Sequence, residues 1–65
     1  MNEAQTVYVV TCMDQDGYRS ILAVWSSQAL ADAFVDRFVE AHKEDPFWRL
    51  DDIVIESIVL DESRF

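Results

Sequence analysis

The chain has 65 residues, of which 51% are hydrophobic, and its 13 acidic side chains outnumber 5 basic ones to give a formal net charge of −8. This length allows one domain, spanning residues 1–65, whose core is too small to enclose a cofactor. The single Cys excludes an intramolecular disulfide, and the acidity excludes unaided binding to nucleic acid, because each phosphate contact needs a cation.

A β-hairpin is predicted at the start of the chain. Residues 6–13 are rich in β-branched and aromatic side chains, as is typical of a strand. Asp16-Gly17 follows as a turn signal, because glycine accepts a positive φ. Residues 18–25 are predicted to return as the second strand.

An amphipathic helix is expected over residues 27–43. If Ser26 caps its first turn, Trp25 and Leu30 can form a hydrophobic staple. The apolar positions then repeat with helical period, and they are Leu30, Phe34, Phe38 and Ala41, flanked by Ala31 and Val35. Pro46 prevents the helix from continuing.

A third strand is predicted over residues 53–60, after a short aromatic connection at residues 47–50. The fold class is therefore α+β, with the element order ββαβ. A crossover through the helix that docks the third strand beside the first gives an antiparallel sheet of order 2-1-3 with the helix on one face. Order 1-2-3 is the alternative, and residues 61–65 are expected to be a frayed polar tail.

Both faces of this predicted sheet are apolar. We assign to the helix side Tyr8, Val10, Cys12, Ile21, Ala23, Trp25, Ile53, Ile55 and Val59. The opposite face is the predicted self-association face, and it holds Val7, Val9, Thr11, Met13, Leu22, Val24, Val54, Ile58 and Leu60. Such a patch is larger than a soluble monomer usually exposes. We expect a second copy of the chain or another protein to cover it, and folding of the tails over it is the alternative.

Two further groups of residues are candidate contacts for a partner. Asp32, Asp36 and Glu40 repeat every four residues, so their carboxylates form a line on the helix, roughly 6 Å apart. That spacing is close to the spacing of phosphates along a nucleic-acid strand, although a solvated helix face gives the same pattern. Phe47, Trp48 and Arg49 include the residue types favoured in interface hot spots, and the alternative is that the two aromatic rings cap the core.

The usual constellations of enzymes and metal sites are missing from the sequence. His42 has no second His or paired Cys with which to bind a metal, and Cys12 lies in an apolar run that suits a buried hydrophobic residue. No apolar segment approaches the roughly 20 residues that cross a bilayer. We expect a cytoplasmic protein without enzymatic activity, cofactor, metal or membrane partner.

The pattern of the chain resembles a group of small ββαβ proteins of bacteria and their phages. The resemblance rests on Val7-Tyr8-Val9-Val10, Asp16-Gly17, Val24-Trp25-Ser26-Ser27, Ala31, Phe34 and Asp61. It covers most of the chain and implies the fold, but it carries no functional residue, because that group has no assigned chemistry. In size and acidity the chain is also similar to phage-encoded inhibitors such as anti-CRISPR proteins.

Two functional hypotheses follow. In the first, the chain is a phage-encoded inhibitor whose acidic helix line and aromatic connection engage a basic, nucleic-acid-binding surface of a host protein, so that salt weakens binding. In the second, it is a homodimeric structural or regulatory assembly protein that associates through the apolar sheet face, and salt does not weaken that association.

Overall fold

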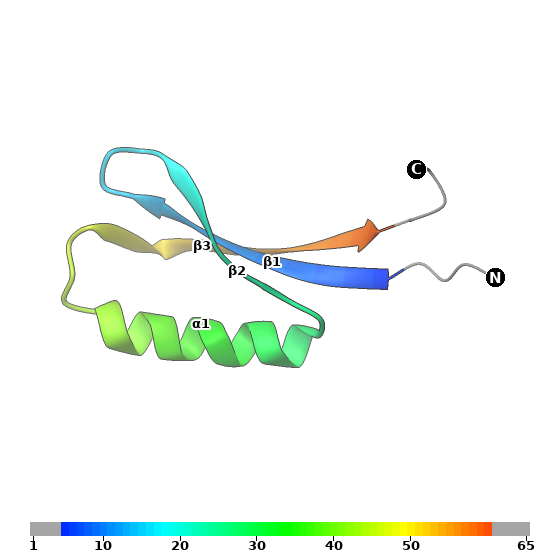
Figure 1. Ribbon diagram of the computed structural model, residues 1–65. Helices are drawn as coiled ribbons and strands as arrows, with labels where there is room; N and C mark the ends of the chain where they lie inside the picture. Colours follow the sequence, from blue (N-terminus) through cyan, green and yellow to red (C-terminus); the bar gives the residue numbers. More distant parts are fainter. Residues whose placement is uncertain (1–4, 61–65) are drawn as a thin grey trace.

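The computed structural model describes residues 5–60 and consists of one sheet with one helix packed on it (Figure 1). In chain order the elements are β1 (Gln5–Asp14), β2 (Arg19–Trp25), α1 (Gln28–His42) and β3 (Trp48–Leu60). β1 pairs antiparallel with both of its neighbours, and the sheet order is β2-β1-β3. The predicted fold class and sheet order are confirmed. The predicted tail at residues 61–65 lies outside the described residues.

The turn between β1 and β2 is organised by the Asp14 carboxylate. Its Oδ1 accepts hydrogen bonds from the backbone N–H groups of Asp16 (2.9 Å) and Tyr18 (3.0 Å). Gly17 has a φ of 88°, a conformation that other residues rarely adopt. Asp14 is buried because these N–H groups satisfy its oxygen, so the turn accounts for the buried carboxylate.

The N-terminus of α1 is capped by Ser27, whose Oγ accepts a hydrogen bond from the N–H of Leu30 at 3.2 Å. The cap is therefore Ser27 and not Ser26, the residue on which the expected contact between Trp25 and Leu30 depended. Ala31 is fully buried while Leu30 is 48% exposed, so the helix packs on the sheet with its buried stripe rotated away from the predicted one. The Trp25 ring packs on Phe34, with ring centroids 5.8 Å apart.

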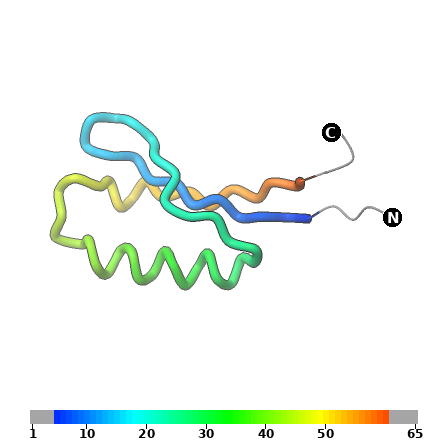
Figure 2. The backbone as a smooth tube through the Cα atoms, in the orientation of Figure 1, coloured from blue at the N-terminus to red at the C-terminus, as the bar shows by residue number. Residues whose placement is uncertain are grey.

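Aromatic rings fasten the helix to both outer strands. Phe34 stacks on Phe38 along α1, and Phe38 meets the edge of the Trp48 ring from β3, with centroids 5.8 and 5.7 Å apart. Together with the contact between Trp25 and Phe34, these rings establish that α1 covers the face of Trp25 and Trp48. Figure 2 shows the helix running along this face of the sheet.

The same face carries the buried centre of the molecule. Val10 and Cys12 on β1 are fully buried, and with Ala31 they are the buried hydrophobic residues of the described chain. Val10 lies opposite Ala23 of β2 and Ile55 of β3, so the helix side is the one predicted from the sequence at these positions. The core is therefore small even for a chain of this length.

The alternation predicted for β2 fails in its first half. A β-bulge interrupts the pairing after Val10, so Leu22 has no directly opposite residue and Ile21 lies opposite Thr11. Ile21 therefore belongs to the face away from the helix, where it is 69% exposed, and its assignment to the helix side is wrong. The physical reason is that one extra residue reverses the alternation of a strand.

β3 begins earlier than predicted, because the expected aromatic connection is part of the strand. Trp48 pairs with Asp14 and Arg49 pairs with Met13. Three residues, 50–52, then bulge out before Ile53 resumes the pairing opposite Cys12. From Ile53 to Leu60 the pairing with β1 is uninterrupted, and the side chains alternate as predicted.

Candidate protein-interaction surfaces

One side of the sheet, which we call the open face, is not covered by any element of residues 5–60. Strand register places on it Val7, Val9, Thr11, Met13, Ile21, Val24, Val54, Ile58 and Leu60, together with Arg19, Arg49 and Glu56. Exposed hydrophobic side chains gather here: Ile21 is 69% exposed, Val24 55%, Leu60 49%, Val54 43% and Ile58 39%. Apart from Leu22 at the bulge, the residues predicted for the self-association face lie on this one surface.

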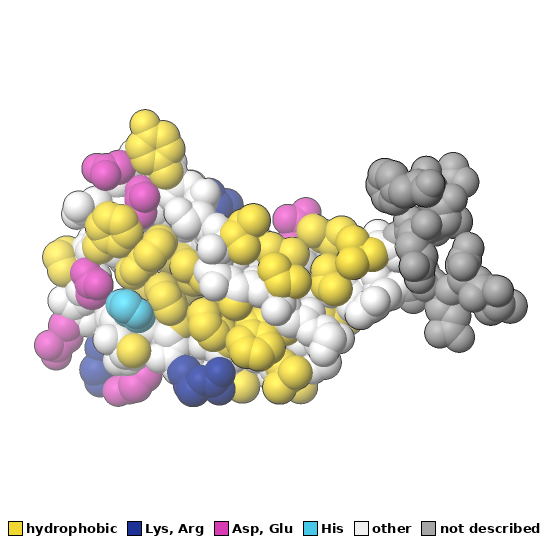
Figure 3. Space-filling view, in the orientation of Figure 1, with side chains coloured by type: hydrophobic (Ala, Val, Ile, Leu, Met, Phe, Trp, Pro, Cys, Tyr) yellow, Lys and Arg dark blue, Asp and Glu magenta, His cyan; other side chains and the backbone are white. Residues whose placement is uncertain are grey.

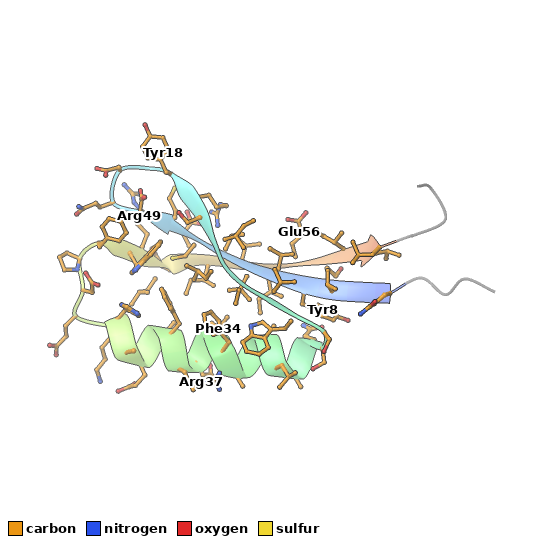
Figure 4. The ribbon with its side chains drawn as sticks, in the orientation of Figure 1. Tyr8, Tyr18, Phe34, Arg37, Arg49 and Glu56 are labelled. Atoms are coloured by element: carbon orange, nitrogen blue, oxygen red, sulfur yellow. The ribbon has the colours of Figure 1, made fainter. Side chains whose placement is uncertain are left out.

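The positive and negative side chains of the open face nearly cancel, whereas the chain as a whole has a net charge of −8. The Arg19 guanidinium donates to Thr11 Oγ1 at 3.0 Å and pairs with the Asp52 carboxylate at 2.6 Å. Arg49 lies opposite Met13, and Glu56 lies opposite Val9 and points away from the helix (Figure 4). Most of the acidic residues therefore lie elsewhere, and Figure 3 shows them gathered at the end of the molecule with the hairpin turn.

The predicted acidic line is present on the outer side of α1. Asp32, Asp36 and Glu40 are all exposed. Within residues 5–60 no ion pair involves Asp32 or Asp36, whereas Glu40 pairs with Lys43 at 2.9 Å. Arg37 extends away from the sheet beside this line (Figure 4) and reduces its net charge.

Phe47, Trp48 and Arg49 do not form one surface. Trp48 packs between Phe38 and Phe47, with ring centroids 5.7 and 4.8 Å away, on the helix side of the sheet. Arg49 is the next residue of β3, so its side chain lies on the open face. Phe47 and Trp48 therefore lie at the end of the core on the helix side, whereas Arg49 lies on the open face.

The helix C-terminus holds a local polar network. Asp45 accepts hydrogen bonds from the Phe47 backbone N–H at 3.0 Å and lies 3.4 Å from His42 Nδ1. The Phe47 hydrogen bond, followed by His42, lowers the pKa of the Asp45 carboxyl below its usual value. Asp45 and the groups that it contacts are exposed. Their hydrogen bonds explain why the helix ends here, and they do not indicate a catalytic site.

Cys12 is a packed core residue. Its side chain is fully buried, and its thiol lies 3.4 Å from the carbonyl oxygen of Arg49. Burial raises the pKa of the Cys12 thiol, so the neutral form is favoured. A buried, protonated thiol suits packing and not nucleophilic attack.

A metal site and a membrane-spanning helix are both absent from the part of the chain that the structure describes. Within residues 5–60, no group of three or more His, Cys, Asp or Glu side chains is placed to hold a metal ion. α1, the helix of the described chain, is too short and too polar to cross a membrane.

Comparisons of the chain with family models, curated proteins and solved structures gave no match. The resemblance to small ββαβ proteins of bacteria and phages therefore stays a prediction. The surfaces have to be interpreted from their own chemistry.

Sequence reasoning missed the two bulges and the aromatic start of β3. Nothing in the local sequence marks Leu22 as an inserted residue, because its neighbours are equally apolar. The start of β3 had a signal: Trp48 and Leu50 alternate with Arg49 and Asp51, which is the alternation of a strand.

Proposed function

We propose that the protein is a non-enzymatic assembly module that forms a homodimer through its open face. The observation that carries this proposal is the exposure of five large aliphatic side chains on one face of the sheet, from 39% at Ile58 to 69% at Ile21. Isolated surface hydrophobic residues are ordinary, but a continuous apolar patch of this kind is typical of an interface.

The size of the open face suits this role. Strands of 10, 7 and 13 residues span about 480 Å² in projection, at a rise of about 3.3 Å and a spacing of about 4.8 Å. The accessible area of side chains that project from a sheet is larger than its projection. A specific interface of standard size buries roughly 800 Å² per partner, so a stable dimer has to cover nearly the whole open face.

Charge favours a second copy as the occupant. The open face carries Arg19, whose charge is compensated by Asp52, together with Arg49 and Glu56. Two such faces do not repel each other strongly, and Arg49 of one copy can pair with Glu56 of the other. The acidic residues on α1 and on the loops stay in water, where they keep the assembly soluble.

Val24→Lys tests this proposal. Val24 is 55% exposed and lies opposite Val9, so the monomer tolerates a lysine there, whereas a dimer has to bury it. A symmetric dimer buries two such charges, each costing about 3–5 kcal/mol when unpaired, so we expect the dimer to weaken by at least about ten-thousandfold in sedimentation velocity. Ala33→Lys on the exposed outer side of α1 is the charge-matched control, and it should leave the dimer intact. A dimer that is unaffected by Val24→Lys would refute the assignment of the open face.

The second candidate function is inhibition of a nucleic-acid-binding protein, as expected for a phage-encoded, anti-CRISPR-like inhibitor. The observation in its favour is that Asp32 and Asp36 are exposed and that neither forms an ion pair with the residues described. A basic host surface could bind them in place of phosphates.

Charge reversal distinguishes the two functions. Asp32→Lys, Asp36→Lys and Glu40→Lys together should abolish binding to a basic partner and leave self-association unchanged. The matched comparison uses double variants, Asp32→Lys with Asp36→Lys against Asp16→Lys with Asp51→Lys, because the second pair is exposed and belongs neither to the helix line nor to the open face. Equal loss of binding in both double variants would mean that total charge, and not the helix line, recruits the partner.

The proposed location is the cytoplasm. The support is the free, buried Cys12, which suits a reducing compartment. Export of the protein to an oxidising compartment, detected by cell fractionation, would contradict this.

A further inference from the structure

Among residues 5–60, no strand pairs with the outer edge of β3, and this edge lacks the usual protection. The order β2-β1-β3 makes β3 an edge strand of 13 residues. Its first part is protected, because residues 50–52 bulge out of the pairing and carry Asp51 and Asp52. From Ile53 to Leu60 the strand is regular, has no Pro, Gly or Lys, and contains the single charge of Glu56. Such an edge is a template for another strand.

The other edge of the sheet differs in each of these respects. β2 has 7 residues, is interrupted by the bulge at Leu22, and begins with Arg19. A short, bulged and charged edge resists strand addition. Strand pairing is therefore expected at β3 and not at β2.

β1 and β3 also project as a two-stranded ribbon beyond the rest of the molecule. β2 ends at Trp25 opposite Tyr8, so residues 5–7 of β1 pair only with residues 58–60 of β3. Figures 1 and 2 show this ribbon extending past the first turn of α1. Val59, on the helix side of the sheet, is 61% exposed because the helix does not reach it. A ribbon of two strands with apolar side chains on both faces is not stable in water without further pairing.

We propose that β3 of one chain pairs antiparallel with β3 of a second copy, with the two-fold axis at Ser57. The result is a continuous six-stranded sheet, in which each projecting ribbon lies beside the helix-covered half of the other chain. An axis perpendicular to the sheet keeps both helices on one side. Residues that pair across this axis have to lie on the same face of the sheet. The axis is therefore centred where one residue faces its own copy in the partner, and not midway between two successive residues.

The side chains select the register centred on Ser57. A centre at Glu56 places two carboxylates opposite each other, which is unfavourable. A centre at Ile55 puts two acids opposite aliphatic residues, Asp52 opposite the partner's Ile58 and Glu56 opposite the partner's Val54. With Ser57 at the axis, Val54 meets the partner's Leu60 and Ile55 meets the partner's Val59. One acid, Glu56, then lies opposite the partner's Ile58, so this register leaves the fewest acids beside aliphatic side chains.

The two proposed interfaces are compatible. The axis of the edge interface is perpendicular to the sheet, whereas the axis of the open-face dimer lies parallel to it. Perpendicular two-fold axes that intersect generate a closed tetramer, whereas perpendicular axes that do not meet generate a filament, so the tetramer requires the two axes to intersect. The tetramer rests on the proposed function, but the edge pairing does not.

Cysteine cross-linking tests the register. In Ser57→Cys the two thiols face each other across the axis, within the distance that a disulfide spans. In Val59→Cys they are about 13 Å apart along the strands, from a rise of about 3.3 Å per residue, although position 59 is well exposed. We expect Ser57→Cys to form covalent dimers with diamide about tenfold faster or more than Val59→Cys, because a disulfide cannot bridge Cα atoms much beyond about 7 Å. Equal rates, or no cross-link at Ser57→Cys, would overturn the proposal.

The number of chains in the assembly of each variant shows which of the two interfaces, the β3 edge or the open face, is present. By sedimentation velocity, the full chain should be a tetramer, Val24→Lys and Ser57→Lys should each be dimers, and the double variant should be a monomer. If the full chain is a dimer that only Val24→Lys dissociates, the edge pairing is wrong and the open-face dimer stands. If only Ser57→Lys dissociates it, the edge pairing stands and the open-face dimer is wrong. Circular dichroism of each variant reports whether its fold is retained.

Discussion

The small core makes the protein unusually sensitive to the loss of one buried side chain, and Val10→Ala measures this. Val10 is fully buried at the centre of the sheet, between Ala23 and Ile55. The substitution removes two methyl groups, worth about 0.8 kcal/mol each in transfer free energy. The cavity left behind, about 50 Å³, adds about 1.2 kcal/mol at about 24 cal/mol per Å³. We therefore expect a loss of about 2.5–3 kcal/mol, more than half of what so small a core usually supplies.

Urea unfolding followed by circular dichroism measures this effect. With a slope of about 1 kcal/mol/M for a small domain, the midpoint should fall by about 2.5 M in Val10→Ala. Val24→Ala removes the same two methyl groups from a side chain that is 55% exposed, so in dilute solution it should cost under about 1 kcal/mol. At high protein concentration the Val24→Ala deficit should grow, because a dimer interface adds to stability by mass action. A Val24→Ala deficit in dilute solution that equals the Val10→Ala deficit would refute the account of the core.

Three further substitutions test local features of the fold. Gly17→Ala should lower the free energy of unfolding by about 1–2 kcal/mol in urea, because its φ of 88° strains any residue with a Cβ, although no atom lies within 4 Å of that position. Ser27→Ala should cost about 1 kcal/mol in the same assay, since it removes the acceptor of the Leu30 N–H. Asp45 has a lowered pKa in the folded state, so its contribution is present above the unfolded pKa and is lost as the pH falls through the folded one. In Asp45→Asn, the free energy of unfolding should therefore fall less between neutral and acid pH than it does in the unaltered chain. An identical pH dependence of the two proteins would contradict this role of Asp45.

The elements and their order follow from the sequence because each is encoded locally. The Asp16-Gly17 turn, the Ser27 cap and the apolar period of α1 act over a few residues. The alternation of β3 from Ile53 to Leu60 is also local, and it assigned Val54, Ile58 and Leu60 to the correct face. Antiparallel order then follows from the crossover through a single helix.

The bulges could not be predicted in this way, because they arise between strands. The position of Ile21 depends on where β1 and β2 come back into register around the turn, and no residue of β2 records that choice. The separation of Trp48 from Arg49 likewise depends on β3 starting early enough to pair with Asp14. A surface patch was therefore predictable where alternation held and not where the register shifted.

The most direct test of the central claim is the mass of the full chain in solution as a function of its concentration. Multi-angle light scattering from low to high micromolar protein, at low and high salt, reports whether the chain binds a second copy, and the same measurement on Val24→Lys shows whether that binding uses the open face. We predict species of two or more chains that do not dissociate as salt rises, because the interface is apolar. A single species of 7.5 kDa across the whole concentration range would contradict the account.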